Sequence, residues 1–137
     1  MQRHENEVAL MLEAGYVLRY AHRYNEAREI FYATRALLPR NEVSDLALAG
    51  VFLDEGKYEE AMAHCQRALN LNSSSAPTYI QLAEIHLSQG DYTRAKRNLQ
   101  RARELAPKGP IAELTKAFMK LVSVAGPKTQ PARVIST

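Results

Sequence analysis

The sequence predicts an all-α fold: an α-solenoid of three helix-turn-helix repeats, followed by a capping helix at the C-terminal end. The first observation behind this prediction is that residues of the same type return every 34 positions. The second is that apolar residues recur at helical spacing on both sides of each break, so each repeat contains two helices and a turn. The recurring residues are a tyrosine, an alanine, a small residue and a leucine, namely Tyr24, Tyr58 and Tyr92; Ala27, Ala61 and Ala95; Gly15, Ala49 and Ala83; Leu37, Leu71 and Leu105.

The first repeat departs most from the common pattern. Residues 1–7 are expected to extend its first helix as a polar segment, and the repeat itself covers residues 8–41. His22 stands where the other repeats have a turn glycine, and Thr34 replaces a late alanine. The helix pair is therefore expected, while the sharpness of its turn is left open.

The second and third repeats, residues 42–75 and 76–109, follow the pattern more closely. Gly56 and Gly90 are expected to end the first helix of their repeats, because glycine readily takes the left-handed conformation of a helix C-cap. Small residues such as Ala49 allow two helix backbones to approach closely. The helices expected in these repeats lie near residues 42–55, 58–71, 76–89 and 92–105.

The last third of the chain begins with a break at Gly109-Pro110. The stretch after it places its apolar residues on one helical face, so residues 110–125 are predicted to form a capping helix with a polar outer side. From residue 126 to 137 the composition turns to proline, serine and threonine, which predicts a disordered tail.

The composition is that of a soluble globular domain. The 137 residues are 46% hydrophobic and 24% charged, with a single cysteine. No stretch is long and apolar enough to cross a membrane, and none has the pattern of a signal peptide, so a cytoplasmic protein without membrane insertion is expected. The net charge of +3 is unevenly spread: residues 1–93 carry 8 Lys/Arg and 13 Asp/Glu, residues 94–137 carry 10 and 2.

The repeat pattern resembles that of the tetratricopeptide repeat family, which runs W-x2-L-G-x2-Y, then A-x3-F, then P over 34 residues. The three repeats cover 102 of the 137 residues, although none keeps the tryptophan. The resemblance implies a right-handed superhelix in which the first helix of each repeat lines a concave groove. The matching residues in the third repeat are Tyr79, Leu82, Ala83, His86, Gly90, Tyr92, Ala95, Leu99, Ala102 and Pro107.

The same resemblance implies which residues line the groove. Most of them are aliphatic or aromatic, and a contiguous apolar stripe on a charged protein usually marks a binding site. We therefore expect the groove to hold a hydrophobic peptide or helix of another protein, unless the chain's own N-terminal residues or capping helix seal part of it. The predicted groove residues are Leu12, Tyr16, Arg19, Tyr20, Val43, Leu46, Leu53, Ile80, Glu84 and Leu87.

Two kinds of family member can be compared with this chain at the groove positions. Co-chaperones that grip the C-terminal carboxylate of heat-shock proteins use lysine, asparagine and arginine there, whereas this chain offers no cation at the matching slots. An apolar groove with tyrosines at one end is more similar to the small three-repeat chaperones of bacterial type III secretion, which hold a hydrophobic segment of a translocator or needle subunit. Those chaperones are usually acidic, and this chain has a pI near 9.1. The residues at the clamp slots are Leu12, Tyr16, Ala47, Pro77 and Gln81.

Two alternative functions stay open beside the adaptor or chaperone. One is a structural subunit that forms a homo-oligomer through the same stripe. The other is binding of an anionic partner by the basic C-terminal third, which we rank below protein binding because few aromatic residues stand near it to stack on nucleic-acid bases. The basic surface residues are Arg94, Arg97, Arg101 and Lys108.

No enzyme, cofactor site or metal site is expected. The sequence has neither HExxH nor paired CxxC, the usual spacings of zinc ligands. Cys65 and His86 fall on core slots and are interpreted as packing, and His64 is interpreted as a surface residue.

Overall fold

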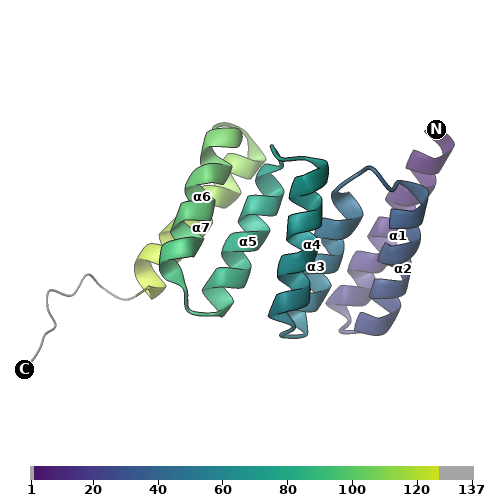
Figure 1. The fold of residues 1–137 in the computed structure, drawn as a ribbon, viewed down its shortest axis with the longest axis horizontal. Helices are drawn as coiled ribbons and strands as arrows, with labels where there is room; N and C mark the ends of the chain where they lie inside the picture. The colour runs from purple at the N-terminus through teal and green to yellow at the C-terminus, as the bar shows by residue number, and fades with distance from the viewer. Residues whose placement is uncertain (1, 127–137) are drawn as a thin grey trace, which may run out of the picture.

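The computed structural model describes residues 2–126, with side chains from residue 5, and within them it contains seven helices and no strand. Figure 1 shows the helices side by side in a row, from the first pair at one end to the last two helices at the other. α2, α4 and α6 lie nearer the viewer than α1 and α3. The helices are α1 (Gln2–Tyr20), α2 (Tyr24–Leu37), α3 (Val43–Asp54), α4 (Tyr58–Leu71), α5 (Ala76–Ser88), α6 (Tyr92–Leu105) and α7 (Pro110–Ala125).

The predicted all-α repeat fold is confirmed, and the four helices expected between residues 42 and 105 are present within one residue of their predicted ends. The capping helix expected at residues 110–125 corresponds to α7. The disordered tail predicted for residues 126–137 lies, apart from Gly126, outside the described residues.

The three turns inside the repeats share one geometry. Gly56 and Gly90 have φ of 74° and 77°, and His22 takes the same left-handed conformation at φ 62°. In each turn the next backbone N–H reaches back to the helix, for example from Arg23 to the Leu18 carbonyl at 2.8 Å. His22 therefore closes the first turn as tightly as glycine closes the other two, despite the steric cost of a left-handed side-chain residue, about 1 kcal/mol.

Two apolar clusters hold the repeats together. The first joins α2, α3, α4 and α5 around buried residues such as Phe31, Leu48 and Ile85. The second joins α5, α6 and α7 around residues such as Leu99 and Val122. Each cluster thus extends from one repeat into a neighbouring repeat or into the capping helix, as expected of a solenoid.

The two ends of the row leave apolar side chains exposed. Leu10 and Val17 on α1 are 68% and 67% exposed. The residues at the same repeat positions of α3, Ser44 and Val51, are buried. On α7 the side chains of Leu114, Leu121 and Val124 are exposed. The outer side of the capping helix is therefore less polar than the sequence predicted, because no further helix covers it within the described residues.

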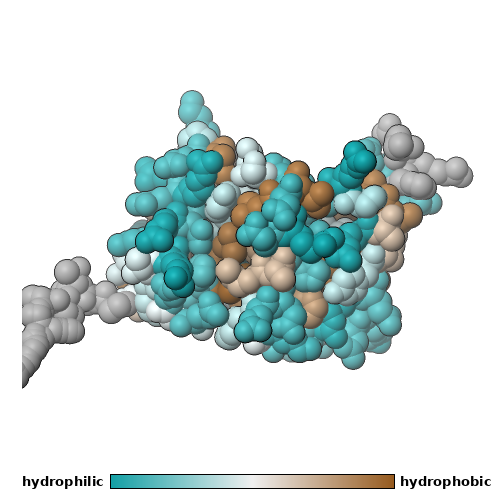
Figure 2. Space-filling model, viewed as in Figure 1, coloured by the Kyte–Doolittle hydropathy of each residue, from teal (hydrophilic) through white to brown (hydrophobic). Residues whose placement is uncertain are grey.

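Figure 2 shows the face of the molecule on which α2, α4 and α6 lie. This face is mostly hydrophilic, with hydrophobic residues gathered near its middle. The candidate binding surface was predicted on the first helices instead, which lie behind these three.

Candidate protein-binding groove

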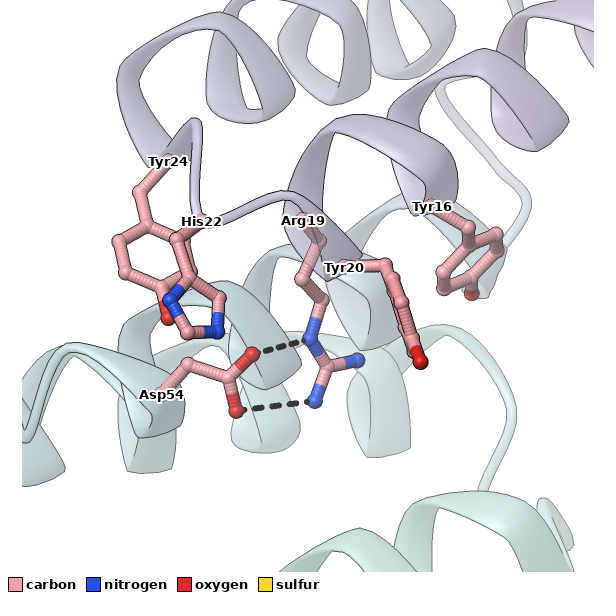
Figure 3. A pocket seen from close by; sticks show the side chains of 6 residues that line it. All are labelled: Tyr16, Arg19, Tyr20, His22, Tyr24 and Asp54. Atoms are coloured by element: carbon pink, nitrogen blue, oxygen red, sulfur yellow. Dashed lines mark hydrogen bonds and ion pairs between the residues drawn. The ribbon is translucent and has the colours of Figure 1, made fainter.

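The first-helix face, by which we mean the surface of α1, α3 and α5 that carries the predicted groove residues, is hollowed at the end nearest the N-terminal repeat. A pocket of about 760 Å³ opens there (Figure 3). Its wall comes from the end of α1, the turn after it, the start of α2 and the end of α3. The lining residues are Tyr16, Arg19, Tyr20, His22, Tyr24 and Asp54.

An ion pair between two repeats forms the polar part of this pocket. The Arg19 guanidinium donates from Nε to Asp54 Oδ2 at 2.6 Å and from Nη2 to Asp54 Oδ1 at 3.1 Å, as drawn in Figure 3. This two-point geometry fixes both side chains and joins α1 to α3. The hydrogen bond to Asp54 is the main cause that raises the pKa of Arg19, so the guanidinium stays charged.

Gly50 makes room for this arrangement. A Cβ atom at Gly50 would lie 2.4 Å from Arg19 Nη1 and 2.8 Å from Arg19 Cζ, well inside van der Waals contact. The guanidinium therefore lies directly against the backbone of α3, in the place where a larger residue would put its own side chain.

The aromatic residues of the pocket differ in how firmly they are held. The Tyr16 ring packs on buried Phe31, with 5.3 Å between ring centroids, and burial raises the pKa of its hydroxyl. The rings of His22 and Tyr24 stack at 5.6 Å. Tyr20 is 89% exposed, which leaves nearly its whole ring free to contact a ligand. An exposed aromatic side chain beside a hollow is the usual anchor of a protein interface.

Three of the predicted groove residues, Tyr16, Arg19 and Tyr20, meet in this pocket. A further six predicted groove residues are half-buried and do not line the pocket: Leu12, Val43, Leu46, Leu53, Glu84 and Leu87.

Ile80 does not belong to an open groove wall. It is only 4% exposed and packs in the same apolar cluster as Val122 of α7. The prediction that Ile80 lines an open groove was therefore wrong. The assignment of groove positions from the repeat pattern takes no account of the capping helix, which shares this apolar cluster. The apolar surface left for a partner is smaller than the sequence suggested.

Two lining residues, His22 and Tyr24, do not occupy groove positions of the repeat pattern, whereas Asp54 occupies such a position in the second repeat. A sequence signal existed for each. His22 replaces a turn glycine, Tyr24 is the repeated tyrosine after the turn, and Asp54 has a charge opposite to that of Arg19 in the neighbouring repeat. The pocket lies between two repeats, so groove positions assigned within a single repeat do not show that these residues lie together.

The basic surface residues lie on α6 and in the loop after it, and all four are exposed. Two of them are engaged locally, since Arg94 pairs with Asp91 at 3.3 Å and Arg101 with Glu104 at 3.2 Å. Arg97 and Lys108 form no ion pair with the described residues. Local pairing lowers the net positive charge that this surface offers an anionic partner.

A second polar cluster, around the fully buried Asp45 of α3, links three helices. Its Oδ1 accepts from Arg35 on α2 at 3.3 Å, and from His64 and Arg67 on α4 at 2.9 and 3.2 Å. The interpretation of His64 as a surface residue was wrong: its side chain is 11% exposed, and its ring stacks on Phe52. These contacts compensate a buried charge and hold α3 between its neighbours.

The part of the chain that the structure describes contains no group of three or more histidine, cysteine, aspartate or glutamate side chains placed to hold a metal ion. Cys65 is fully buried, and burial, with the Glu84 charge, raises the pKa of its thiol to about 12. A thiol with such a pKa stays protonated at neutral pH and is a poor nucleophile. None of the helices between residues 2 and 126 combines the length and hydropathy that a membrane span requires.

Comparison with known families gives two overlapping matches, both described as tetratricopeptide repeat. They cover residues 12–77 and 52–117, and together they take in all three predicted repeats apart from the first four residues. No curated protein sequence matches the chain.

Among solved structures, the fold is similar to PcrH from Pseudomonas aeruginosa, with 24% identity, a TM-score of 0.72, and 87% of this chain and 93% of that one covered. It is also similar to the Yersinia enterocolitica type III secretion chaperone SycD in complex with a peptide of the translocator YopD, with 16% identity, a TM-score of 0.70 and coverage of 88% and 95%. A third similar structure is the first repeat domain of Spaghetti (RPAP3) bound to the HSP90 peptide SRMEEVD, with 21% identity, a TM-score of 0.69 and coverage of 88% and 93%. At these identities the likeness establishes the fold.

Proposed function

The chain belongs to the tetratricopeptide repeat family, and on that basis we propose that it is a non-catalytic adaptor or chaperone that binds a hydrophobic segment of another protein on its first-helix face. The observation that carries this proposal is the pocket of about 760 Å³ beside the exposed ring of Tyr20. A soluble protein gains nothing in stability from an aromatic ring left in water. Tyr20 and Tyr16 together offer a partner an apolar surface with hydroxyl groups at its edge.

The solved structures support this kind of ligand. SycD was solved with a translocator peptide and Spaghetti with an HSP90 peptide, so these two proteins of the same fold bind peptides of other proteins. Transfer of an aromatic side chain of about 200 Å² from water contributes up to about 5 kcal/mol. After the ordering of the peptide is subtracted, about 1–2 kcal/mol is expected from Tyr20 alone.

The narrower proposal is a cytoplasmic chaperone of type III secretion that keeps a translocator segment bound until export. The likeness to SycD and PcrH supports it, as does the tyrosine-rich end of the face. The alternative of a carboxylate clamp is disfavoured because the Nε–Nη2 edge of the Arg19 guanidinium is already paired with Asp54. The basic pI sets this chain apart from the acidic composition usual among such chaperones.

The proposal is tested by selecting a displayed library of random peptides on the immobilised protein. Selected peptides should be rich in apolar residues. In solution they should bind Tyr20→Ala about 5- to 30-fold more weakly than wild type, which corresponds to the 1–2 kcal/mol above. Val17→Ala is the matched control, because Val17 lies on the same helix and is 67% exposed but does not line the pocket.

Peptides that bind both variants like wild type would place the binding surface elsewhere and contradict the proposal. Light scattering on the same samples tests the structural-subunit alternative. A stable oligomer that Tyr20→Ala dissociates would show that the first-helix face serves self-association instead.

A further inference from the structure

One repeat position on the first-helix face carries three different residues on three neighbouring helices. Tyr16 on α1, Gly50 on α3 and Glu84 on α5 are each 34 residues apart. Tyr16 lines the pocket, and a side chain at Gly50 would point at the Arg19 guanidinium, which itself lines the pocket. The repeat relation therefore puts Glu84 on the same face, one helix farther along.

The charges near this position do not balance. Arg19 gives its Nε and Nη2 donors to Asp54, so those two charges compensate each other. Glu84 is half-buried, and its side chain makes no hydrogen bond or ion pair with any residue between 5 and 126. Arg19, Asp54 and Glu84 together carry a formal charge of one minus, and the uncompensated carboxylate is Glu84.

The surroundings of Glu84 favour its neutralisation. Burial is the main cause that raises the pKa of Glu84, the Asp54 charge raises it further, and Arg19 lowers it. A carboxylate that is partly removed from water gains from a cation that enters the same space, because a charge-assisted hydrogen bond is stronger where water is scarce. An anion would meet Glu84 and Asp54 at once, and a neutral group would leave the desolvated carboxylate uncompensated.

We propose that Glu84 gives the first-helix face a preference for guest segments that carry a lysine or arginine among their apolar residues, with the basic side chain paired to the Glu84 carboxylate. This inference rests on the proposed function, since it names the kind of segment that the face accepts. Tyr16 and Tyr20 bind the apolar part of the guest, and Glu84 selects its charge and register.

The experiment is the same peptide selection, carried out in parallel on wild type, Glu84→Gln and Glu29→Gln. Glu29 is an exposed glutamate of α2 that forms no ion pair with the residues the structure describes, so it controls for the loss of one negative charge. Peptides selected on wild type and on Glu29→Gln should share one enriched lysine or arginine position, and those selected on Glu84→Gln should not. Circular dichroism checks that each variant is folded.

The decisive measurement uses one selected peptide and its lysine-to-glutamine version. Wild type should bind the lysine peptide about tenfold more tightly, as expected of a charge-assisted hydrogen bond. Glu84→Gln should bind the two peptides equally, while Glu29→Gln keeps the preference.

Two outcomes would overturn the inference. If apolar peptides are selected and depend on Tyr20 but show no basic preference, or keep that preference in Glu84→Gln, the charge selection is wrong and the proposed function stands. If no selected peptide depends on Tyr20, the proposed function fails and this inference fails with it.

Discussion

Gly15 and Phe31 allow a quantitative test of how closely the first repeat is packed. A Cβ atom added at Gly15 would lie 2.3, 2.6 and 2.9 Å from the Cε1, Cζ and Cδ1 atoms of Phe31. Phe31 is fully buried and cannot move its ring into solvent. Gly15→Ala should therefore force α1 and α2 apart, or displace a ring that packs on Tyr16.

The expected magnitude is a balance of two effects. Alanine stabilises a helix interior by about 1 kcal/mol relative to glycine. Overpacking of a filled core costs about 1–3 kcal/mol. With approaches this short the upper part of that range applies, so we expect Gly15→Ala to lower the free energy of unfolding by about 1–2 kcal/mol.

A second substitution reverses the sign. Phe31→Leu removes the two ring atoms closest to the added methyl group, so Gly15→Ala in that background should keep its helical gain and raise stability by about 1 kcal/mol. The coupling energy between the two sites is then about 2–3 kcal/mol, near the upper end for residues in contact.

The assay is urea unfolding of the four proteins, followed by circular dichroism and compared at equal m-values. The packing argument is refuted if Gly15→Ala is as stable as wild type, or if it has the same effect with phenylalanine and with leucine at position 31.

Three further predictions concern single groups. Because burial raises the pKa of Glu84 in the folded state, its contribution to stability is present below the unfolded pKa and is lost as pH rises through the folded one. Glu84→Gln should thus unfold at a higher urea concentration than wild type at neutral pH, and the difference should vanish in acid. A difference that stays the same at every pH would contradict this assignment. The charged or titratable neighbours of Glu84 are Arg19, Asp54 and Cys65. Cys65, with a thiol pKa of about 12, should resist iodoacetamide in the native protein and react only after urea is added, as seen by mass spectrometry; rapid native labelling would show that the thiol is accessible. Gly56→Ala should cost about 1 kcal/mol in urea unfolding because φ is 74° while the added Cβ meets nothing within 4 Å, and Gly56→Asn should cost less; equal losses would point to a contact rather than to the backbone.

The fold could be predicted because its signals are local and repeated. Gly56 and Gly90 mark turns whose left-handed conformation glycine takes without steric cost, and the helices between them follow from apolar spacing. His22 shows the limit of this reasoning. Its place in the repeat marks a turn, but a histidine does not by itself specify the left-handed conformation that it takes at φ 62°, where the Arg23 N–H bonds to the Leu18 carbonyl.

Three of the predicted groove residues, Tyr16, Arg19 and Tyr20, line the pocket. The pairing of Arg19 with Asp54 depends on the angle between two repeats, which no slot rule contains. Gly50 occupies a groove position of the second repeat, but the space that it leaves for the Arg19 guanidinium depends on how two repeats are placed and appears only in the structure. Ile80 was predicted to face the groove, whereas it is buried in an apolar cluster that also includes Val122 of α7.

The pocket belongs to a junction, because its walls come from the first repeat and from α3 of the second. In a linear array of repeats, cooperativity depends on how strongly neighbours hold each other. A ligand bound at this junction would hold the first repeat against the second and suppress local unfolding of the first repeat. Occupancy of the pocket would then be reported by slower hydrogen exchange throughout α1 and α2, including residues that the ligand never touches.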